Sequence, residues 1–359
     1  MVNNSGIGTH IRGLIEGMAE FASSETLPNF TFLGDPSALS RYPAFAMLGD
    51  TINVPMAIYS FREQMAFPRL AKAGLYHFPH YNTPISQTAP FVVTVHDLIH
   101  MLFPQYVASR TKWLLGRRVL KHAVTRARAV FTVSEGTRSD LVTHLGVDPS
   151  RIYLTPNAVS RHFSRPGRVA IDTLRRRLSL DEEFFLAAGV DKPHKNFVFL
   201  VESFVEWRKR SGASIELVIC GVKGGNGPLA KFVADHRPVG VRILEFQNYS
   251  VMPELLAAAK ALVFPSLYEG FGLPILEAQR VGTPVLSSRA SCMPWVAGER
   301  GALFFDPHDS AELADCFDRI MGSEEISRGL AEAGHANEAR FSWADSARKT
   351  LEVYARVYP

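Results

Sequence analysis

Glu269 and Glu277, which follow an apolar run of strand length (261–264), form the arrangement in this chain that best suits a polar ligand. A glycine turn over 270–272 separates the two carboxylates, and Pro274 suits the first turn of a helix, in which Glu277 is also expected to lie. Unpaired N–H groups at a helix start attract an anion, and carboxylates beside them accept hydrogen bonds from hydroxyls. The spacing therefore predicts a strand, a turn and a helix that bind the phosphates and hydroxyls of a nucleotide-sugar. The alternative is a plain tight turn whose glutamates only favour the helix dipole.

Short apolar runs alternate with helix-length segments along the chain, a pattern that predicts parallel α/β sheets. Expected strands in the first half are 30–33, 75–78, 91–95, 129–133 and 151–154. Those in the second half are 184–189, 215–221, 241–244, 261–264 and 284–286. With 359 residues the chain is long enough for two domains of ordinary size. We expect a first domain over 1–160, a basic irregular linker over 161–180 and a second domain over 181–341.

The composition is that of a globular protein that works inside the cell. Hydrophobic residues make up 47% of the chain and charged residues 21%, and no run of apolar residues is long enough to span a membrane. The N-terminal residues lack the basic start and apolar core of a secretion signal. Cys220, Cys292 and Cys316 are widely spaced without metal-ligand pairing, so we expect reduced structural thiols. These features predict a cytoplasmic location.

The net charge is +4, and positive charge is concentrated between Asp97 and Glu135, where no acidic residue occurs. On a helix, four of these cations would lie on one stripe: Arg110, Arg117, Lys121 and Arg128. The functional interpretation is peripheral adhesion to the anionic cytoplasmic face of a membrane, where each basic side chain adds roughly 1 kcal/mol. A solvated basic face is the alternative. Nucleic-acid binding is not expected, because no zinc, RNP or similar signature accompanies the stripe.

The full string 265–278 resembles the signature of glycosyltransferase family 4, whose members are retaining enzymes of the two-lobed GT-B fold. Other segments resemble the same family, so that the resemblance covers nearly the whole chain: 5–10, 94–98, 132–135 and 189–196. It implies two Rossmann-like parallel-sheet domains that face a cleft, with a final helix over 342–357 that packs back on the first domain. It also implies transfer of a hexose from a nucleotide-diphospho-sugar to a saccharide or lipid-linked saccharide acceptor.

The resemblance also implies a set of positive groups around the donor diphosphate. Lys195 would neutralise the leaving group, and a glycine loop at Gly6 and Gly8 would let backbone amides approach it. Further amides would come from the turn between the glutamates, at Gly270, Phe271, Gly272 and Leu273. Preorganised donors of this kind are usually the largest contribution to catalysis. No Asp-x-Asp metal motif occurs, so we expect neither a metal ion nor another cofactor.

His96 follows the expected strand 91–95, and the resemblance implies that it lies beside the transferred sugar and acts in catalysis with Lys195 and Glu269. Glu269 would contact the donor sugar, and Glu277 would hold the ribose hydroxyls. Acceptor-side candidates lie at the end of the expected strand 75–78 and just after it: His77, His80, Tyr81 and Asn82. We assign no protein nucleophile.

Segments 79–82 and 96–100 look most like the mannosyltransferase branch, which suggests GDP-mannose as the donor, with a UDP-sugar as the alternative. Three features depart from the family pattern. Val190 stands where many members have an arginine, and Trp295 replaces the glutamate of a usual Pro-Glu-Val. Only five residues precede Gly6, so the first β-strand of the domain is missing. We hypothesise that Met1 is an internal methionine of a longer natural chain.

Two other functions are open at this point. A sugar-nucleotide epimerase or hydrolase on the same fold would differ in its products from a labelled donor, with and without acceptors. A noncatalytic scaffold that binds a nucleotide-sugar would bind the donor without turnover on any acceptor.

Overall fold

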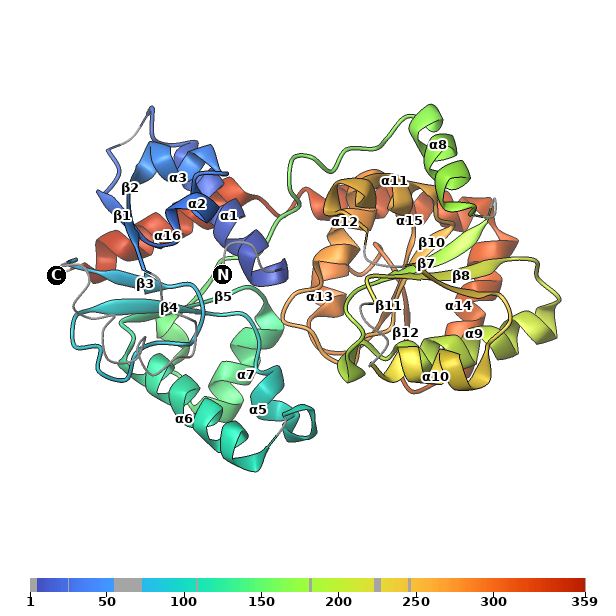
Figure 1. Ribbon diagram of the computed structural model, residues 1–359, viewed down its shortest axis with the longest axis horizontal. Helices are drawn as coiled ribbons and strands as arrows, with labels where there is room; N and C mark the ends of the chain where they lie inside the picture. The colour runs from blue at the N-terminus through green and yellow to red at the C-terminus, as the bar shows by residue number, and fades with distance from the viewer. Residues whose placement is uncertain are drawn as a thin grey trace. The chain divides into compact units, whose positions relative to one another are not determined.

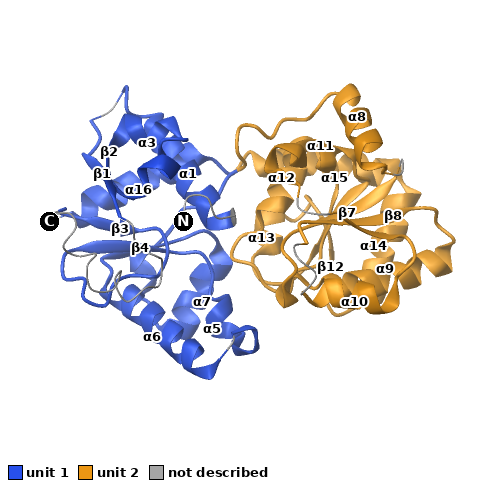
Figure 2. Ribbon diagram, in the orientation of Figure 1, with its two compact units in different colours: residues 1–158, 341–359 blue, residues 159–340 orange. Residues whose placement is uncertain are grey.

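The computed structural model describes residues 5–24, 26–54, 73–107, 109–180, 183–222, 227–244 and 247–358. The chain forms two compact α/β units, which Figure 2 shows in different colours. Unit 1 comprises residues 1–158 and 341–359, and unit 2 comprises residues 159–340. Each unit has its own parallel sheet and its own hydrophobic core. Met1 lies outside the described residues.

Unit 1 contains a four-stranded parallel sheet of order β3-β4-β5-β6 and a two-stranded parallel sheet of β1 and β2. Its strands are β1 (Phe30–Gly34), β2 (Gly49–Asn53), β3 (Tyr76–Phe78), β4 (Phe91–Val95), β5 (Ala129–Thr132) and β6 (Ile152–Leu154). Its helices are α1 (Ser5–Ala19), α2 (Pro36–Leu39), α3 (Pro43–Leu48), α5 (Ile99–Leu102), η2 (Pro104–Tyr106), α6 (Arg110–Arg126), α7 (Glu135–Leu145), η3 (Pro149–Arg151) and α16 (Trp343–Val357). The five strands expected in this half are confirmed, and β2 was not expected.

Helices α6 and α16 both lie beside the four-stranded sheet of unit 1 (Figure 1), and alternate residues of its central strands pack against different ones of them. Val92 and Phe131 pack with Val353 of α16. Val93 and the neighbouring strand β5 pack with Leu120 of α6. Successive side chains of a strand point to opposite faces of the sheet. The continuous apolar run 91–95 therefore buries both faces, as parallel sheets require.

Helix α16 joins the C-terminal segment to unit 1. The indole of Trp343 lies so close to Gly13 of α1 that an added Cβ would come within 2.1 Å of it. Ala347 belongs to the same core cluster as Leu14 of α1. The helix expected over 342–357 is therefore present and packs on the first unit.

Unit 2 contains a six-stranded parallel sheet of order β12-β11-β10-β7-β8-β9. Its strands are β7 (Phe184–Ala188), β8 (Glu216–Cys220), β9 (Val241–Leu244), β10 (Ala261–Phe264), β11 (Val285–Ser288) and β12 (Leu303–Phe305). Its helices are α8 (Arg168–Leu178), η4 (Pro193–Lys195), α9 (Phe197–Ser211), α10 (Pro228–His236), η5 (Tyr249–Val251), α11 (Met252–Ala258), α12 (Leu273–Val281), α13 (Met293–Ala297), α14 (Ser310–Gly322) and α15 (Glu324–Glu338). The five expected strands are confirmed, and β12 was not expected.

The strand order of unit 2 reverses between β7 and β10 (Figure 1). From β7 the chain runs outward through β8 and β9, and it then returns to β10 on the other side and runs outward through β11 and β12. In open parallel sheets, ligands bind outside the carboxyl ends of the strands at such a reversal. The segments that follow β7 and β10 are therefore the first place to look for a site.

The prediction of an irregular linker over 161–180 is wrong for most of its length. Residues 168–178 form helix α8, whose Leu174 is buried. Arg175 donates to the carbonyl of Ala258 at 2.7 Å and so attaches α8 to α11 in unit 2. Apolar residues at 171, 174 and 178 have helical spacing, which the basic composition of the segment concealed.

The basic segment of unit 1 forms helix α6, and Arg110, Arg117 and Lys121 are exposed on it. Arg128 is not part of this stripe, because the helix ends at Arg126. The guanidinium of Arg128 donates instead to the carbonyl of Val357 at 2.7 Å and holds the end of α16.

Candidate functional site

Lys195 and Glu269 lie in the segments that follow β7 and β10, the two strands at the reversal of the unit 2 sheet. Lys195 Nζ lies 2.6 Å from Glu269 Oε1, and the two side chains are 16% and 14% exposed. Ser266 Oγ donates to the same carboxylate oxygen at 2.7 Å. The ammonium also lies 5.3 Å from the centre of the Phe264 ring. The two residues that the sequence analysis assigned to one donor site are thus in direct contact.

This ion pair holds two groups that a ligand can separate. A carboxylate and a phosphate accept the same charge-assisted hydrogen bonds, so a phosphate oxygen that binds Lys195 competes with Glu269 for the ammonium. The carboxylate of Glu269 then becomes an acceptor for a hydroxyl. The pair can therefore be exchanged for a phosphate on the cation and a sugar hydroxyl on the anion.

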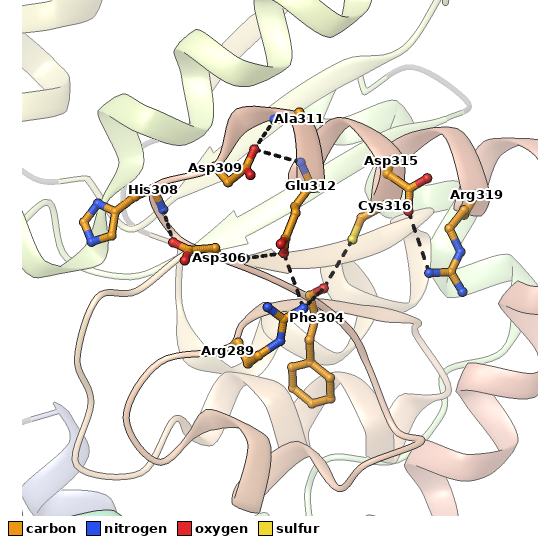
Figure 3. A network of polar contacts seen from close by, with 10 residues as sticks. All are labelled: Arg289, Phe304, Asp306, His308, Asp309, Ala311, Glu312, Asp315, Cys316 and Arg319. Atoms are coloured by element: carbon orange, nitrogen blue, oxygen red, sulfur yellow. Dashed lines mark hydrogen bonds and ion pairs between the residues drawn. The ribbon is translucent and has the colours of Figure 1, made fainter.

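The backbone next to Lys195 is held by the turn between β12 and α14. Asn196 has a left-handed conformation with φ of 57°, and its Nδ2 donates to the carbonyl of Pro307 at 2.8 Å. Figure 3 shows the polar network that holds this turn and the start of α14, in which Asp309 caps the helix and Glu312 pairs with Arg289. The backbone beside the lysine is therefore attached to a turn that has its own network of polar contacts.

Side chains from the segment after β11 fix the turn that follows Glu269. Ser291 Oγ donates to the carbonyl of Glu269 at 2.9 Å, and Cys292 Sγ donates to the carbonyl of Phe271 at 3.2 Å. Gly272 has φ of 99°, a conformation that favours glycine, and α12 begins directly after it. The predicted strand, turn and helix are confirmed, including the proline in the first helical turn. Contact between the amides of 270–273 and a diphosphate stays a prediction.

Glu277 is 5% exposed and lies in the second turn of α12, not in the first as expected, because the helix begins at Leu273. Its Oε1 accepts a hydrogen bond from the hydroxyl of Tyr249. Burial raises the pKa of the Glu277 carboxyl to about 7, and the hydrogen bond from Tyr249 opposes this rise. The described residues give the carboxyl no cationic partner that affects its pKa. Buried carboxyls of this kind are costly, and they are concentrated at functional sites.

Histidines gather at the carboxyl ends of β3 and β4 in unit 1. His96 directly follows β4, and its Nε2 donates to the carbonyl of Pro79, which directly follows β3, at 2.8 Å. That bond leaves Nδ1 of the neutral ring as an acceptor. Burial lowers the pKa of His96 and lowers the pKa of the neighbouring His80 to about 3, with a smaller contribution from His96. Neutral imidazoles at this edge can accept a hydrogen bond from a hydroxyl.

His10 completes this cluster, although the sequence analysis did not single it out. Its ring lies 4.8 Å from that of His96, nearly at right angles, and its Nδ1 donates to Asn157 Oδ1 at 2.8 Å. Its Nε2 is buried without a hydrogen-bond partner in the described part of the chain. Burial, and then His96, hold the pKa of His10 well below its usual range. Asn157 follows β6 near the same edge of the sheet, so polar residues after strands were the signal that could have revealed this pair.

Tyr81 and Asn82 lie beside this cluster and are 9% and 4% exposed. The ring of Tyr81 lies 4.0 Å from that of His80. His77 is placed differently, because its Nε2 pairs with the Thr94 hydroxyl at 2.8 Å and its Nδ1 with the hydroxyl of Tyr354 on α16. His77 therefore joins the sheet to α16, whereas the acceptor-side role of the other three residues stays a prediction.

The glycine segment near the N-terminus is helical, so the prediction of a loop there is wrong. Helix α1 begins at Ser5, which puts Gly6 and Gly8 in its first two turns. Apolar side chains farther along α1, among them Leu14 and Met18, pack in the same cluster as α16 and stabilise the helix. The first N–H groups of a helix have no partner inside it, so amides at this end are still oriented as donors.

The two departures from the family pattern lie close to the turns already described. Val190 is 50% exposed. The ring of Trp295 lies 6.4 Å from that of Phe271, so the substituted residue contacts the turn between the glutamates.

A cavity of about 870 Å³ lies at the opposite end of the unit 2 sheet, beside the residues that precede β7, β10 and β11. Its cationic lining residues are Arg165, Arg175, Lys260, Arg280 and Arg328. Two of them form ion pairs, Lys260 with Glu183 at 2.9 Å and Arg280 with Glu338 at 2.6 Å. We assign this cavity no role, because ligands of parallel sheets bind at the carboxyl ends of the strands.

Among the described residues, no group of three or more His, Cys, Asp or Glu side chains could hold a metal ion. No described helix is long and apolar enough to cross a membrane.

Comparisons with known proteins agree with this geometry. The family model "Glycosyltransferase Family 4" matches residues 36–163, and "Glycosyl transferases group 1" matches residues 171–336. The chain is 28% identical to "O-antigen chain mannosyltransferase B" of Escherichia coli, over 79% of this chain and 74% of the relative. It is 31% identical to "MMP alpha-(1->4)-mannosyltransferase" of Mycolicibacterium hassiacum, over 75% of this chain and 66% of the relative.

Solved structures of low sequence identity share the fold. The sucrose-phosphate synthase of Thermosynechococcus elongatus has a TM-score of 0.75 at 21% identity, over 99% of this chain and 94% of that one. Anabaena Alr3699/HepE, solved in complex with UDP-glucose, has a TM-score of 0.75 at 16% identity, over 97% of this chain and 96% of that one. With two Rossmann-like units and matches to both family models, the chain belongs to glycosyltransferase family 4 and is a glycosyltransferase of the GT-B fold.

Proposed function

We propose that this glycosyltransferase moves a mannosyl group from GDP-mannose to a saccharide or lipid-linked saccharide acceptor, with retention of configuration. The observation that carries the proposal is the Lys195–Glu269 pair at the reversal of the unit 2 sheet. Two relatives of the chain are named mannosyltransferases, which supports the choice of sugar. A UDP-sugar is the alternative donor, because one structural neighbour was solved with UDP-glucose.

In the proposed reaction, the bond between the anomeric carbon and the diphosphate oxygen breaks as an acceptor hydroxyl forms the new glycosidic bond on the same face. The proton of the acceptor hydroxyl passes to the departing phosphate. Negative charge grows on the diphosphate, and Lys195 with the amides of 270–273 stabilises it. Glu269, released from the lysine, accepts a hydrogen bond from a hydroxyl of the sugar. Glu277 accepts hydrogen bonds from the ribose.

The histidine cluster of unit 1 would serve the sugar and the acceptor. His96 has an acceptor nitrogen at Nδ1 because its Nε2 is held by the carbonyl of Pro79. Burial lowers the pKa of His96 and His80. Both rings therefore stay neutral near pH 7 and can bind hydroxyls without adding a charge. Tyr81 and Asn82 would add further polar groups on the acceptor side.

Product analysis tests this proposal. The purified protein is incubated with GDP-mannose, UDP-glucose or other UDP-sugars and a panel of saccharide and lipid-linked acceptors, and NMR reads the configuration of the new linkage. We expect an α-mannosyl product from the α-linked donor GDP-mannose. Transfer from a UDP-sugar alone would overturn the assignment of the donor. Free mannose or a changed sugar nucleotide without an acceptor product would indicate a hydrolase or an epimerase.

We also propose that unit 1 binds the anionic cytoplasmic face of a membrane through α6. Exposed cations on this helix include Arg117 and Lys121. Leu114 and Leu115 on the same helix are 39% and 59% exposed, so apolar side chains accompany the positive charge. A helix that presents both kinds of side chain suits an anionic membrane surface, where a lipid-linked acceptor would be found.

A further inference from the structure

The carboxyl of Glu277 accepts a hydrogen bond from a hydroxyl of the protein itself. It is 5% exposed and accepts a hydrogen bond from Tyr249. Within the described residues, no other hydrogen bond to this carboxyl is found. The proposed function requires the same carboxyl to accept the vicinal hydroxyls of the donor ribose. A chemically similar hydroxyl of the protein therefore occupies the place that the ligand needs.

Tyr249 is placed so that it can leave this position. It lies at the start of the short helix η5, outside the sheet, and it is 37% exposed. Its ring lies 5.0 Å from that of His162 and 5.2 Å from that of Phe163. Rotation of the side chain about this contact would move the hydroxyl from the carboxyl toward water, where it loses little because water replaces the acceptor.

We propose that Tyr249 is a displaceable internal ligand of Glu277, which the ribose hydroxyls of the nucleotide-sugar must replace during binding. The inference rests on the proposed function, because it takes Glu277 as the ribose subsite. The hydroxyl of Tyr249 satisfies a buried acceptor, and a nucleotide that binds Glu277 must replace this hydrogen bond, which weakens its binding. A ligand that displaces Tyr249 loses the free energy of this hydrogen bond unless its own hydroxyls bind the carboxyl.

The Tyr249 hydroxyl could either compete with the ribose or orient Glu277 for it, and the two hypotheses predict opposite effects of Tyr249→Phe on nucleotide affinity. If the hydroxyl competes with ribose, its removal leaves the carboxyl unpaired in the empty protein, and nucleotide affinity increases. If the hydroxyl instead orients Glu277 for the ligand, its removal lowers the affinity. The phenylalanine keeps the ring beside His162 and Phe163 and removes the hydroxyl that binds Glu277.

The test is isothermal titration calorimetry of GDP and UDP against the full-length wild type, Tyr249→Phe, Glu277→Gln and the double variant. We expect Tyr249→Phe to bind the cognate nucleotide about tenfold more tightly than the wild type. We expect Glu277→Gln to bind it more weakly, and Tyr249→Phe to bring no further gain in the Glu277→Gln background. The matched control is Tyr153→Phe in unit 1, which also removes one hydroxyl and should leave the affinity unchanged; circular dichroism verifies folding.

Each other outcome has a separate meaning. If Glu277→Gln weakens binding but Tyr249→Phe binds equally or more weakly, displacement is wrong and the ribose assignment stands. If the wild type binds a nucleotide and Glu277→Gln binds it equally well, the ribose subsite lies elsewhere and both ideas fail. If the wild type binds neither nucleotide, the proposed function itself fails, and the inference with it.

Discussion

Replacement of Glu277 by glutamine should stabilise unit 2 in a pH-dependent way. The ordinary pKa of this carboxyl is 4.5, and burial raises it to about 7 in the folded chain. Between these values the folded protein holds a proton that the unfolded chain has released. Stability therefore falls as the pH rises through this window, because the folded state binds more protons. Glutamine has nearly the same shape and carries no charge at any pH.

The size of the effect follows from the shift. One pKa unit corresponds to about 1.4 kcal/mol, so a shift from 4.5 to about 7 removes about 3 kcal/mol of stability by pH 8. Glutamine avoids this loss, but its amide brings an N–H group without a partner, which destabilises the variant by about 1 kcal/mol. We therefore expect Glu277→Gln to be about 2 kcal/mol more stable than the wild type at pH 8. At pH 5, where the folded carboxyl is already protonated, the difference should largely vanish.

Unit-resolved measurements are needed because the chain has two units and need not unfold in one step. Hydrogen exchange read by mass spectrometry in strands β7 and β8 reports the opening of the unit 2 core. Urea titrations at pH 5 and pH 8 give the difference between the variants. The control is Glu206→Gln on the exposed face of α9, which should follow the wild type at both pH values.

The reasoning would be refuted if Glu277→Gln were less stable than the wild type at pH 8. It would also be refuted if the variant showed the same difference at both pH values. The first result would mean that the charged carboxyl is stabilised by a partner, and the second that the effect is one of packing alone.

Three further expectations concern catalysis, acid stability and membranes. Lys195→Ala should lower kcat about 10²- to 10³-fold with any donor that reacts, whereas Lys209→Ala on α9 should not; an unchanged kcat would remove Lys195 from the site. Below pH 6.5, unfolded His77 and His80 take up protons that the folded rings do not, since burial lowers the pKa of both to about 3. Unit 1 should thus lose up to about 1.4 kcal/mol per pH unit for each histidine on acidification, and equal stability at pH 5 and pH 7 would contradict this. Arg117→Glu should lower the affinity for phosphatidylglycerol vesicles, measured by co-sedimentation, about tenfold, whereas Lys209→Glu should not. An equal decrease in affinity for both variants would indicate general charge attraction.

Local sequence patterns predicted much of the fold. All ten expected strands are present, because apolar runs of strand length bounded by glycine or polar residues need little context to be recognised. Of the two missed strands, β2 has one large apolar side chain, Ile52, and is only partly buried. Strand β12 is apolar but only three residues long. Helix α8 was missed because its arginines gave the segment the basic composition of a linker, although its apolar side chains have helical spacing.

The candidate site also has parts that the sequence predicted and parts that it missed. The turn after Glu269 and the helix that carries Glu277 were predicted, because a glycine turn and a proline at a helix start are local signals. His10 was missed because its partner Asn157 is 147 residues away along the chain. The supposed glycine loop at Gly6 is helical because side chains farther along α1 pack with α16, at the other end of the sequence.

The sequence by itself therefore determined which residue types are present and which secondary elements carry them, since these depend on neighbours within a few residues. Only the tertiary structure decided which side chains meet. Lys195 and Glu269 are 74 residues apart and form an ion pair because β7 and β10 are adjacent in the sheet. Tyr249 reaches Glu277 across 28 residues for the same kind of reason. Contacts of this kind depend on strand order, which no local pattern specifies.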